Sequence, residues 1–326
     1  MYIEDCYDCT KEYQEDSPKV SISILTYNRK DLLRDLLYSL SKIEYKPLEI
    51  IVVDNHSMDG TDEMLSKDFS FIHHIRTDEN IGVGARNLGM KSAGGEIIIT
   101  VDDDVAGIGD KEIVDLVEYF RKKKDLGALN FKVLEHTTGE ICNWVHHRNA
   151  RDFSSTDFLT YEITEGAVAF RKKILEEVGY YPETFFLSHE GLDLAFRILN
   201  HGYSVMYSPL VAVRHMHSDL GRKSWLRYYY DTRNQFFVAA RNLPVSYTLI
   251  YLARGISSMG VYSLRDGFFR YWVKGVFDGL RGLRQAMSQR SVLNKNTMKM
   301  LKAIDNYRPD LRCIIQERLF KKSVRL

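Results

Sequence analysis

Short apolar runs alternate with amphipathic stretches through the first 125 residues, and this pattern restricts the fold more than any other feature. The apolar runs are rich in β-branched residues, which is typical of buried strands, and we expect strands at 19–25, 49–53, 71–76 and 96–101. Apolar residues at helical spacing follow, and they predict helices at 31–40, from Thr61 (as the N-cap), at 84–92 and at 111–124. The alternation predicts an α/β fold, with a mostly parallel sheet flanked by helices.

Polar residues stand directly after these strands. In a parallel sheet, ligands bind beyond the carboxyl ends of the strands, so position alone marks these residues as candidates for binding. They are Thr26, Tyr27 and Asn28 after the first strand, Asp54 after the second, and Asp102, Asp103 and Asp104 after the fourth.

The three adjacent aspartates favour a cation site. Neighbouring carboxylates repel one another, and a bound cation removes this repulsion. Carboxylate oxygens suit Mg²⁺ or Mn²⁺, and Asp102 and Asp104 point the same way in an extended segment. His215, after a predicted strand at 204–213, can complete the metal shell, although its neighbour His217 is easily confused with it. A solvated loop and an ordinary polar histidine remain open as alternatives.

A second charged group precedes a predicted helix at 192–200. Glu190 is expected in the loop at its start, where a carboxylate can take a proton from an acceptor hydroxyl. Asp193 and Arg197 are four residues apart and are spaced to pair on one helix face. Simple helix capping with a surface ion pair is the alternative. Further upstream, Arg86 follows two glycines and can reach a diphosphate.

The charge is divided unevenly along the chain. Residues 216–326 hold 21 Lys and Arg against 7 Asp and Glu, a net charge of +14, whereas residues 1–215 have a net charge of −13. The acidic part is suited to a cation, and the basic part to phosphates, an anionic membrane or an acidic partner.

Within the basic part, apolar residues form one helical stripe: Phe269, Trp272, Val273, Val276, Leu280, Leu283 and Met287. The basic residues that lie largely off it are Arg270, Lys274, Arg281 and Arg284. A basic amphipathic helix can lie on an anionic membrane. The commoner alternative is that such a stripe packs against the catalytic domain or another subunit.

Composition argues against several other classes of protein. Residues 1–18 are polar and acidic and lack the apolar core of a signal peptide, and Arg254 interrupts the most apolar stretch, so we expect no spanning helix. Cys6 and Cys9 form a C-x-x-C pair while Cys142 and Cys313 stand alone, which predicts free thiols. We therefore expect a cytoplasmic protein, with the basic part suited to the inner face of the membrane.

Taken in order from residue 19 to 215, these motifs resemble glycosyltransferase family 2, whose members have the GT-A fold. The segments that carry the resemblance are S-I-L-T-Y-N-R at 23–29, V-V-D-N-H-S at 52–57, N-I-G-V-G-A-R-N at 80–87, D-D-D at 102–104, E-G-A at 165–167, and H-E-G-L-D-L-A-F-R at 189–197, followed by Gly202-Tyr203 and residues 209–215. One departure matters. Many relatives have Glu-Asp, with the Asp as catalytic base, where this chain has Glu190-Gly191.

The resemblance implies an inverting transfer of sugar from a nucleotide diphosphate sugar, with UDP- and dTDP-sugars favoured, to a glycan or lipid-linked acceptor. It implies Mn²⁺ or Mg²⁺ held by Asp104 and His215 with Asp102 nearby, and Glu190 as the base with Asp193 second. The donor residues it implies are Thr26, Tyr27, Asn28, Asp54, Arg86, Asp102 and Asp103.

The expected division of the chain is a tail at 1–18, a catalytic domain at 19–220 and a basic helical region at 221–326. Two alternatives stay open: a nucleotidyltransferase, and a nucleotide-sugar-binding protein that has lost catalysis. No nucleic-acid partner is expected, because that reading rests on the basic end alone; it would predict salt-sensitive DNA or RNA binding.

Overall fold

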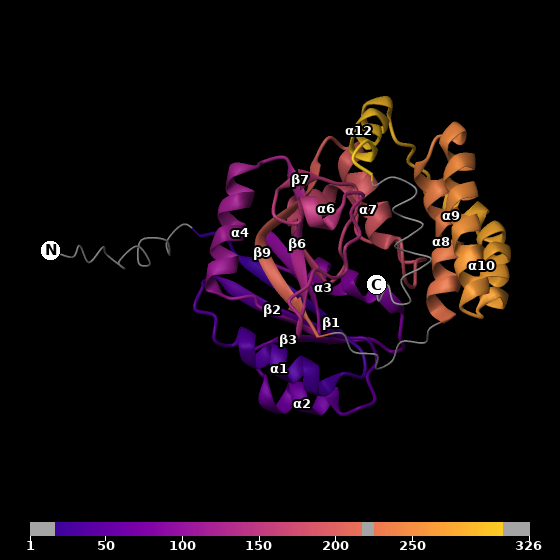
Figure 1. The fold of residues 1–326 in the computed structure, drawn as a ribbon. Helices are drawn as coiled ribbons and strands as arrows, with labels where there is room; N and C mark the ends of the chain where they lie inside the picture. The colour runs from indigo at the N-terminus through magenta and orange to yellow at the C-terminus, as the bar shows by residue number, and fades with distance from the viewer. Residues whose placement is uncertain (1–16, 217–224, 309–326) are drawn as a thin grey trace.

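A nine-stranded sheet with helices on both faces forms the centre of the molecule, and further helices pack against one side of it (Figure 1). This computed structural model describes residues 17–216 and 225–308. The strand order is β3-β2-β1-β4-β8-β6-β9-β5, and β7 pairs with β9.

The first half of the sheet is parallel, as the sequence predicts. Its strands are β1 (Val20–Thr26), β2 (Leu48–Asp54), β3 (His73–Arg76) and β4 (Ile97–Asp102). The helical segments between and after them are α1 (Lys30–Leu40), α2 (Thr61–Asp68), the 3₁₀ turn η1 (Gly82–Ala85), α3 (Arg86–Ser92) and α4 (Asp110–Lys122). One detail of the prediction is wrong. Gly60, in a left-handed conformation, caps α2, and Thr61 is the first helical residue.

The second half of the sheet mixes directions. Its strands are β5 (Val105–Ala106), β6 (Leu126–Glu135), β7 (Phe158–Leu159), β8 (Ala167–Arg171) and β9 (Ser204–His215). β8 runs antiparallel to β4 and β6, whereas β9 runs parallel to β6 and antiparallel to β5. The β5–β9 pairing matters for the site because it sets Val105 opposite His215, and the amide of Met216 donates to the carbonyl of Asp104 at 2.8 Å.

Hydrophobic residues fill both faces of the sheet. α1 and α4 cover one face, with Leu33, Leu37, Ile113 and Phe120 in its core. The other face is covered by α3, α6 (Lys172–Val178) and α7 (Glu190–Asn200), with Phe170, Phe185, Leu194 and Phe237 in its core. A single turn, α5 (Ala150–Phe153), precedes β7.

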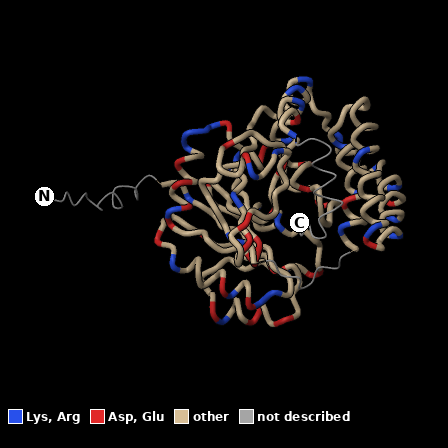
Figure 2. Tube along the Cα trace, in the orientation of Figure 1, with Lys and Arg blue, Asp and Glu red and all other residues tan. Residues whose placement is uncertain are grey.

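Phe237 belongs to α8 (Trp225–Asn242), so the basic C-terminal part shares this core. α8 lies beside α9 (Val245–Arg265) and α10 (Phe269–Arg281) at one side of the molecule, followed by α11 (Leu283–Met287) and α12 (Lys295–Asp305) (Figure 1). Figure 2 shows Lys and Arg spread along these helices, and it shows one group of Asp and Glu near the centre of the molecule besides others around its edge.

α10 packs on α8 through glycines, and Val276 of the predicted apolar stripe packs against the same core. A Cβ on Gly275 would lie 2.7 Å from the carbonyl oxygen of Tyr229, and one on Gly279 would lie 3.0 Å from Cγ of Phe236. The stripe itself is divided. Trp272, Val276 and Leu283 are partly buried, whereas the exposed members are Phe269, Val273, Leu280 and Met287.

Within the described ranges, no helix is both long enough and apolar enough to cross a membrane. Cys142 is half-buried and is a free thiol. Cys6, Cys9, Cys313, His217 and the expected domain boundary at 220 lie outside the described residues.

Candidate active site

Two carboxylates and an imidazole meet where β4 and β9 end. Asp102, Asp104 and His215 each offer one ligand atom, and these atoms all lie within 4.8 Å of one another. Asp104 and His215 are buried, and Nε2 of His215 lies 3.0 Å from Oδ1 of Asp104. The structure therefore brings together the three residues that the sequence singled out as metal ligands.

Arg29, from the loop after β1, reaches the same aspartates. Its Nη1 donates to Oδ1 of Asp103 at 3.0 Å and to Oδ2 of Asp104 at 2.8 Å. Burial alone would lower the pKa of Arg29, but the carboxylates around it raise that pKa on balance. Asp103 also accepts from Thr26 Oγ1 at 2.8 Å, yet burial raises the pKa of Asp103 to about 6.

The sequence analysis gave Arg29 no role of its own. Its position directly after the first strand, at the same edge of the sheet as the three aspartates, could have identified it as a basic residue of the site. Arg29 neutralises part of the negative charge at this edge of the sheet. Thr26 and Asp103 both line the cavity described below, but their side chains are bound to each other.

The two residues expected to bind the nucleobase differ in their exposure to the cavity. Tyr27 is 37% exposed and lines the cavity, together with Asn55. Asp54 is fully buried behind them, where Oδ1 accepts from the amide of Ser57 at 2.8 Å and Oδ2 from Arg76 Nη1 at 2.8 Å. Asp54 therefore holds the loop after β2 in place and presents no free carboxylate to the cavity.

Asn28 holds the same pair of loops together. Its backbone is left-handed, which asparagine tolerates, and its Oδ1 accepts from the amide of Met58 at 2.7 Å. Like Asp54, it does not line the cavity.

Arg86, the first residue of α3, is buried and forms an ion pair with Asp102. Gly166 closes on the same carboxylate from the loop before β8. A Cβ on Gly166 would lie 2.5 Å from Oδ2 of Asp102, and its φ is +78°. Arg86 and Gly166 together fix the position of Asp102.

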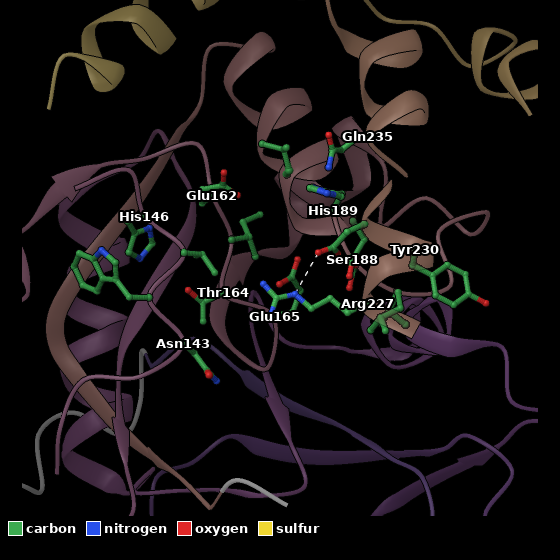
Figure 3. Close-up of a pocket in the computed structure, with 18 of the residues that line it drawn as sticks. Asn143, His146, Glu162, Thr164, Glu165, Ser188, His189, Arg227, Tyr230 and Gln235 are labelled. Carbon is green, nitrogen blue, oxygen red and sulfur yellow. Dashed lines mark ion pairs between the residues drawn. The ribbon is translucent and has the colours of Figure 1, made fainter. Parts of the chain in front are cut away.

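Two buried glutamates lie at the start of α7. Glu190 is the first residue of that helix and is 2% exposed, so its expected place in a loop is wrong. Its Oε2 has no hydrogen-bond partner among the described residues. Glu165, from the loop before β8, accepts from the amide of Gly191 at 2.8 Å through Oε1. Figure 3 shows Glu165 beside the segment that carries Ser188 and His189.

Neither glutamate has the usual acidity of a carboxyl group. Burial raises the pKa of Glu165 to about 7. Burial, followed by the negative charge of Glu165, raises the pKa of Glu190 well above its usual range. Perturbed carboxyl groups in a cleft are typical of functional sites. Glu165 was not among the catalytic residues expected from the sequence, because its closeness to Glu190 depends on how β8 and α7 pack.

Asp193 forms the predicted pair with Arg197, but the pair is buried and not on the surface. Oδ2 of Asp193 accepts from Arg197 Nε at 2.9 Å, and Oδ1 accepts from Arg241 Nε at 2.6 Å and from Asn242 Nδ2 at 2.7 Å. Burial alone would raise the pKa of Asp193, but the two guanidinium groups and these hydrogen bonds lower it on balance.

α8 thus holds α7 from the side, and the same helix holds the segment before α7. Nδ2 of Asn234 donates to the carbonyls of Leu187 and Ser188, both at 2.7 Å. Ser188 and His189 have φ values of +71° and +66°, an uncommon conformation for these residues. The C-terminal part therefore helps to position the start of α7, where Glu190 lies.

An open cavity of about 2930 Å³ connects these groups. Tyr27, Arg86 and Asp102 line it, and so do both glutamates. The remaining wall comes from the loop with Asn143 and His146 and from α8 and α9, including Arg227, Tyr230 and Gln235 (Figure 3). Sites for one small molecule are typically about 300–1,000 Å³, so this cavity has room for two substrates.

Part of the chain matches a known protein family. Residues 21–179 match the model of "Glycosyl transferase family 2". The chain is 28% identical over 225 residues to the O-antigen chain rhamnosyltransferase RfbN of Salmonella typhimurium. The aligned region covers 65% of this chain and 70% of that protein. It is also 28% identical over 208 residues to the uncharacterized glycosyltransferase YwdF of Bacillus subtilis, and this aligned region covers 62% of this chain and 76% of that protein.

Solved structures share the fold at low sequence identity. GalNAc-T7 with UDP, GalNAc and Mn²⁺ superposes with a TM-score of 0.60 at 15% identity, covering 93% of this chain and 58% of that one. Staphylococcus aureus TarS 1–349 with UDP superposes with a TM-score of 0.56 at 20% identity, covering 89% of each chain. Residues 21–179 with their ordered motifs therefore form a glycosyltransferase family 2 domain, and the chain is a nucleotide-sugar glycosyltransferase with a GT-A fold.

Proposed function

We propose that the protein is a metal-dependent, inverting glycosyltransferase that moves a sugar from a UDP- or dTDP-sugar to a hydroxyl group of a glycan or lipid-linked acceptor. The cluster of Asp102, Asp104 and His215, beside Arg86 and on the large cavity, carries this proposal. RfbN acts as an O-antigen chain rhamnosyltransferase, which supports a role in polysaccharide biosynthesis.

The ligand set fits Mn²⁺ or Mg²⁺. Two carboxylates and an imidazole are suitable ligands for Mn²⁺, and carboxylates are the usual protein ligands of Mg²⁺. The three ligand atoms lie within 4.8 Å of one another, so one ion could be held by all three residues. When bound, the ion would stabilise negative charge on the leaving diphosphate.

The chain's own residues supply the rest of the donor site. Tyr27 and Asn55 line the part of the cavity that would receive the nucleoside, and Arg86 lies beside Asp102, where it would meet the diphosphate or the sugar. Asp54 and Asn28 act behind this surface by holding its loops.

The acceptor hydroxyl needs a base at the other side of the donor sugar. Two buried carboxyl groups next to Gly191 are in position, and one of them is Glu190, the base expected from the sequence. Asp193, the second choice, does not line the cavity, and its oxygens are held by Arg197, Arg241 and Asn242. We assign Asp193 a structural role.

Calorimetric titration of UDP, dTDP and GDP, with and without Mn²⁺, tests the donor site. We expect one nucleotide to bind in a Mn²⁺-dependent manner, and we expect Asp104→Ala to abolish this dependence. Asp31→Ala is the control, because Asp31 is exposed on α1 and pairs with Arg34 on the surface. If the folded protein binds none of the three nucleotides, the proposed donor site is wrong.

A finer part of the proposal concerns the membrane. On α10, Phe269, Val273, Phe277 and Leu280 are 39–61% exposed and lie along one face. Arg270, Lys274 and Arg281 are exposed one position after three of them, so an apolar and a basic stripe run side by side. Such a surface fits the interface of an anionic membrane, which is where a lipid-linked acceptor would be found.

Sedimentation with vesicles tests this surface. We expect the protein to bind phosphatidylglycerol vesicles more tightly than phosphatidylcholine vesicles, and Val273→Asp with Phe277→Asp to weaken the binding at least tenfold. Phe71→Asp is the matched control, since Phe71 is 62% exposed and lies before β3. Equal binding by the double variant and the wild type would contradict the assignment to α10.

A further inference from the structure

We propose that Glu165 supplies, from the loop before β8, the carboxylate that position 191 lacks in this chain, and that it takes the proton of the acceptor hydroxyl while Glu190 keeps its own proton beside it. This inference rests on the proposed glycosyl transfer, and it identifies the base within the pair of glutamates.

The first observation is the space above Gly191. A Cβ built on Gly191 would overlap Oε1 of Glu165, and it would lie 2.9 Å from Cδ of Glu165 and 3.0 Å from the carbonyl oxygen of Ile163. The carboxyl group of Glu165 therefore occupies the volume in which any side chain at 191 would begin. The family resemblance indicates an aspartate at this position in many relatives. Here a carboxylate occupies nearly the same place but comes from a different segment.

The second observation is how the two carboxyl groups are hydrogen bonded. Oε1 of Glu165 accepts from the amide of Gly191, which favours its ionised form. Oε2 of Glu190 is buried without a partner among the described residues, which disfavours a charge there. Two adjacent buried carboxyl groups do not both ionise, so this difference assigns the charge to Glu165 and the proton to Glu190.

Other charged and titratable groups face the pair from several elements. Arg86 on α3 lowers the pKa of both glutamates, whereas Glu162 in the same loop as Glu165 and Asp231 on α8 oppose their ionisation. Tyr181 is also near both, and burial keeps its hydroxyl protonated by raising its pKa. Arg86 is therefore a cation that acts on both glutamates while it is paired with Asp102.

The third observation is that Glu165 lies next to the residues of the proposed donor site. The residue after Glu165, Gly166, touches Asp102: the amide of Asp102 donates to the carbonyl of Gly166 at 3.2 Å. Glu165 is thus next to the donor-holding end of β4, and it lines the cavity together with Glu190. A carboxylate at this place can meet an acceptor hydroxyl that approaches the sugar.

The proton and electron balance is that of a single displacement. The acceptor oxygen forms a bond to the anomeric carbon as its proton passes to Glu165. The bond from that carbon to the diphosphate oxygen breaks, and its electron pair leaves with the nucleotide diphosphate. Inversion follows from this geometry, and no covalent intermediate with the chain forms.

Four variants test the assignment: Glu165→Gln, Glu190→Gln, Glu165→Ala, and the double variant Glu165→Ala with Gly191→Asp. The readout is nucleotide diphosphate release from UDP-N-acetylglucosamine, UDP-glucose or dTDP-rhamnose, whichever binds, with water as the acceptor, measured from pH 5 to 9. Glu183→Gln is the control, because Glu183 is exposed and pairs with Lys91 on the surface.

We expect Glu165→Gln to slow release by about 100-fold or more, which is the usual contribution of a general base, with unchanged nucleotide affinity. Glu190→Gln keeps the rate within about tenfold and leaves the acid limb of the pH profile in place, because Glu190 is uncharged where Glu165 titrates and a neutral amide then replaces a neutral acid. The double variant recovers at least tenfold over Glu165→Ala, because the new aspartate restores a carboxylate in the vacated space.

Three outcomes would overturn the inference. They are release by Glu165→Gln at the rate of the wild type, a loss in Glu190→Gln as large as that in Glu165→Gln, and no recovery in the double variant when it binds nucleotide normally. Failure of the proposed function looks different, because the wild-type protein would then show no Mn²⁺-dependent nucleotide binding at all.

Discussion

Asp193→Asn separates a structural role for Asp193 from a chemical one. The substitution keeps the shape of the side chain and removes its charge. In the wild type, the carboxylate is fully buried and accepts from Arg197, Arg241 and Asn242. Without it, two guanidinium groups whose side chains are only 11% and 8% exposed remain close together with no carboxylate between them.

The magnitude follows from this burial. Breaking a buried ion pair by removing one partner typically costs about 3–5 kcal/mol, because the remaining charge stays desolvated. Arg197 also donates to the carbonyls of Val178 and Gly179 at 2.6 and 2.9 Å, so the loop after α6 should loosen as well. With an m value of about 3 kcal/mol/M in urea, the unfolding midpoint should fall by about 1 M or more.

Urea unfolding, followed by tryptophan fluorescence and circular dichroism, measures this difference. Asp31→Asn is the control, since Asp31 is 82% exposed and its pair with Arg34 should contribute no more than about 1 kcal/mol. The folded-state pKa of Asp193 is lowered, so its contribution is present above the unfolded pKa of about 3.9 and is lost as the pH falls through the folded value. The two proteins should therefore converge in strong acid.

One result would refute this reasoning. If Asp193→Asn unfolds at the same urea concentration as the wild type and yet loses sugar transfer, Asp193 acts in the chemistry and not in the packing of α7 against α8.

Two further predictions concern a glycine and a histidine. Gly166→Ala should weaken Mn²⁺-dependent nucleotide binding at least tenfold, because its Cβ would lie 2.5 Å from Oδ2 of Asp102. Gly139→Ala is the control and should leave that binding unchanged, since Gly139 has a φ of +69° but no atom within 4 Å of a Cβ. Equal affinities for the two variants would contradict the steric argument. His147 lies 3.1 Å from Oε1 of Glu162 and 3.3 Å from Oδ1 of Asp305 on α12, and although burial lowers its pKa, these carboxylates raise it on balance. Its contribution to stability should therefore be complete below the ordinary histidine pKa of about 6.5 and should be lost as the pH rises through the higher folded value. His147→Gln should then reduce the difference between the urea unfolding midpoints at pH 6 and pH 9. If that difference is unchanged in the variant, His147 is not the group responsible for it.

The strands and helices of the first half were readable from the sequence because they depend on local periodicity. The β-branched run before Thr26 and the helical spacing of the leucines in α1 each need only neighbouring residues to be recognised. The convergence of Asp102 and Asp104 with the loops after β1 and β2 was also predictable, because the carboxyl ends of parallel strands share one edge of a sheet.

Only the tertiary structure decided which charged residues are held in buried ion pairs and which line the cavity. Asp54 and Asp193 looked like functional carboxylates in the sequence, but Arg76 holds the first, and Arg197 and Arg241 hold the second. Glu165 was not among the catalytic residues expected from the sequence. Its carboxyl group fits beside α7 because Gly191 has no side chain. Partners such as Asp193 and Arg241, or Glu165 and Gly191, are 26 to 48 residues apart in the chain. No local periodicity encodes such pairs, since they depend on the packing of whole helices against the sheet.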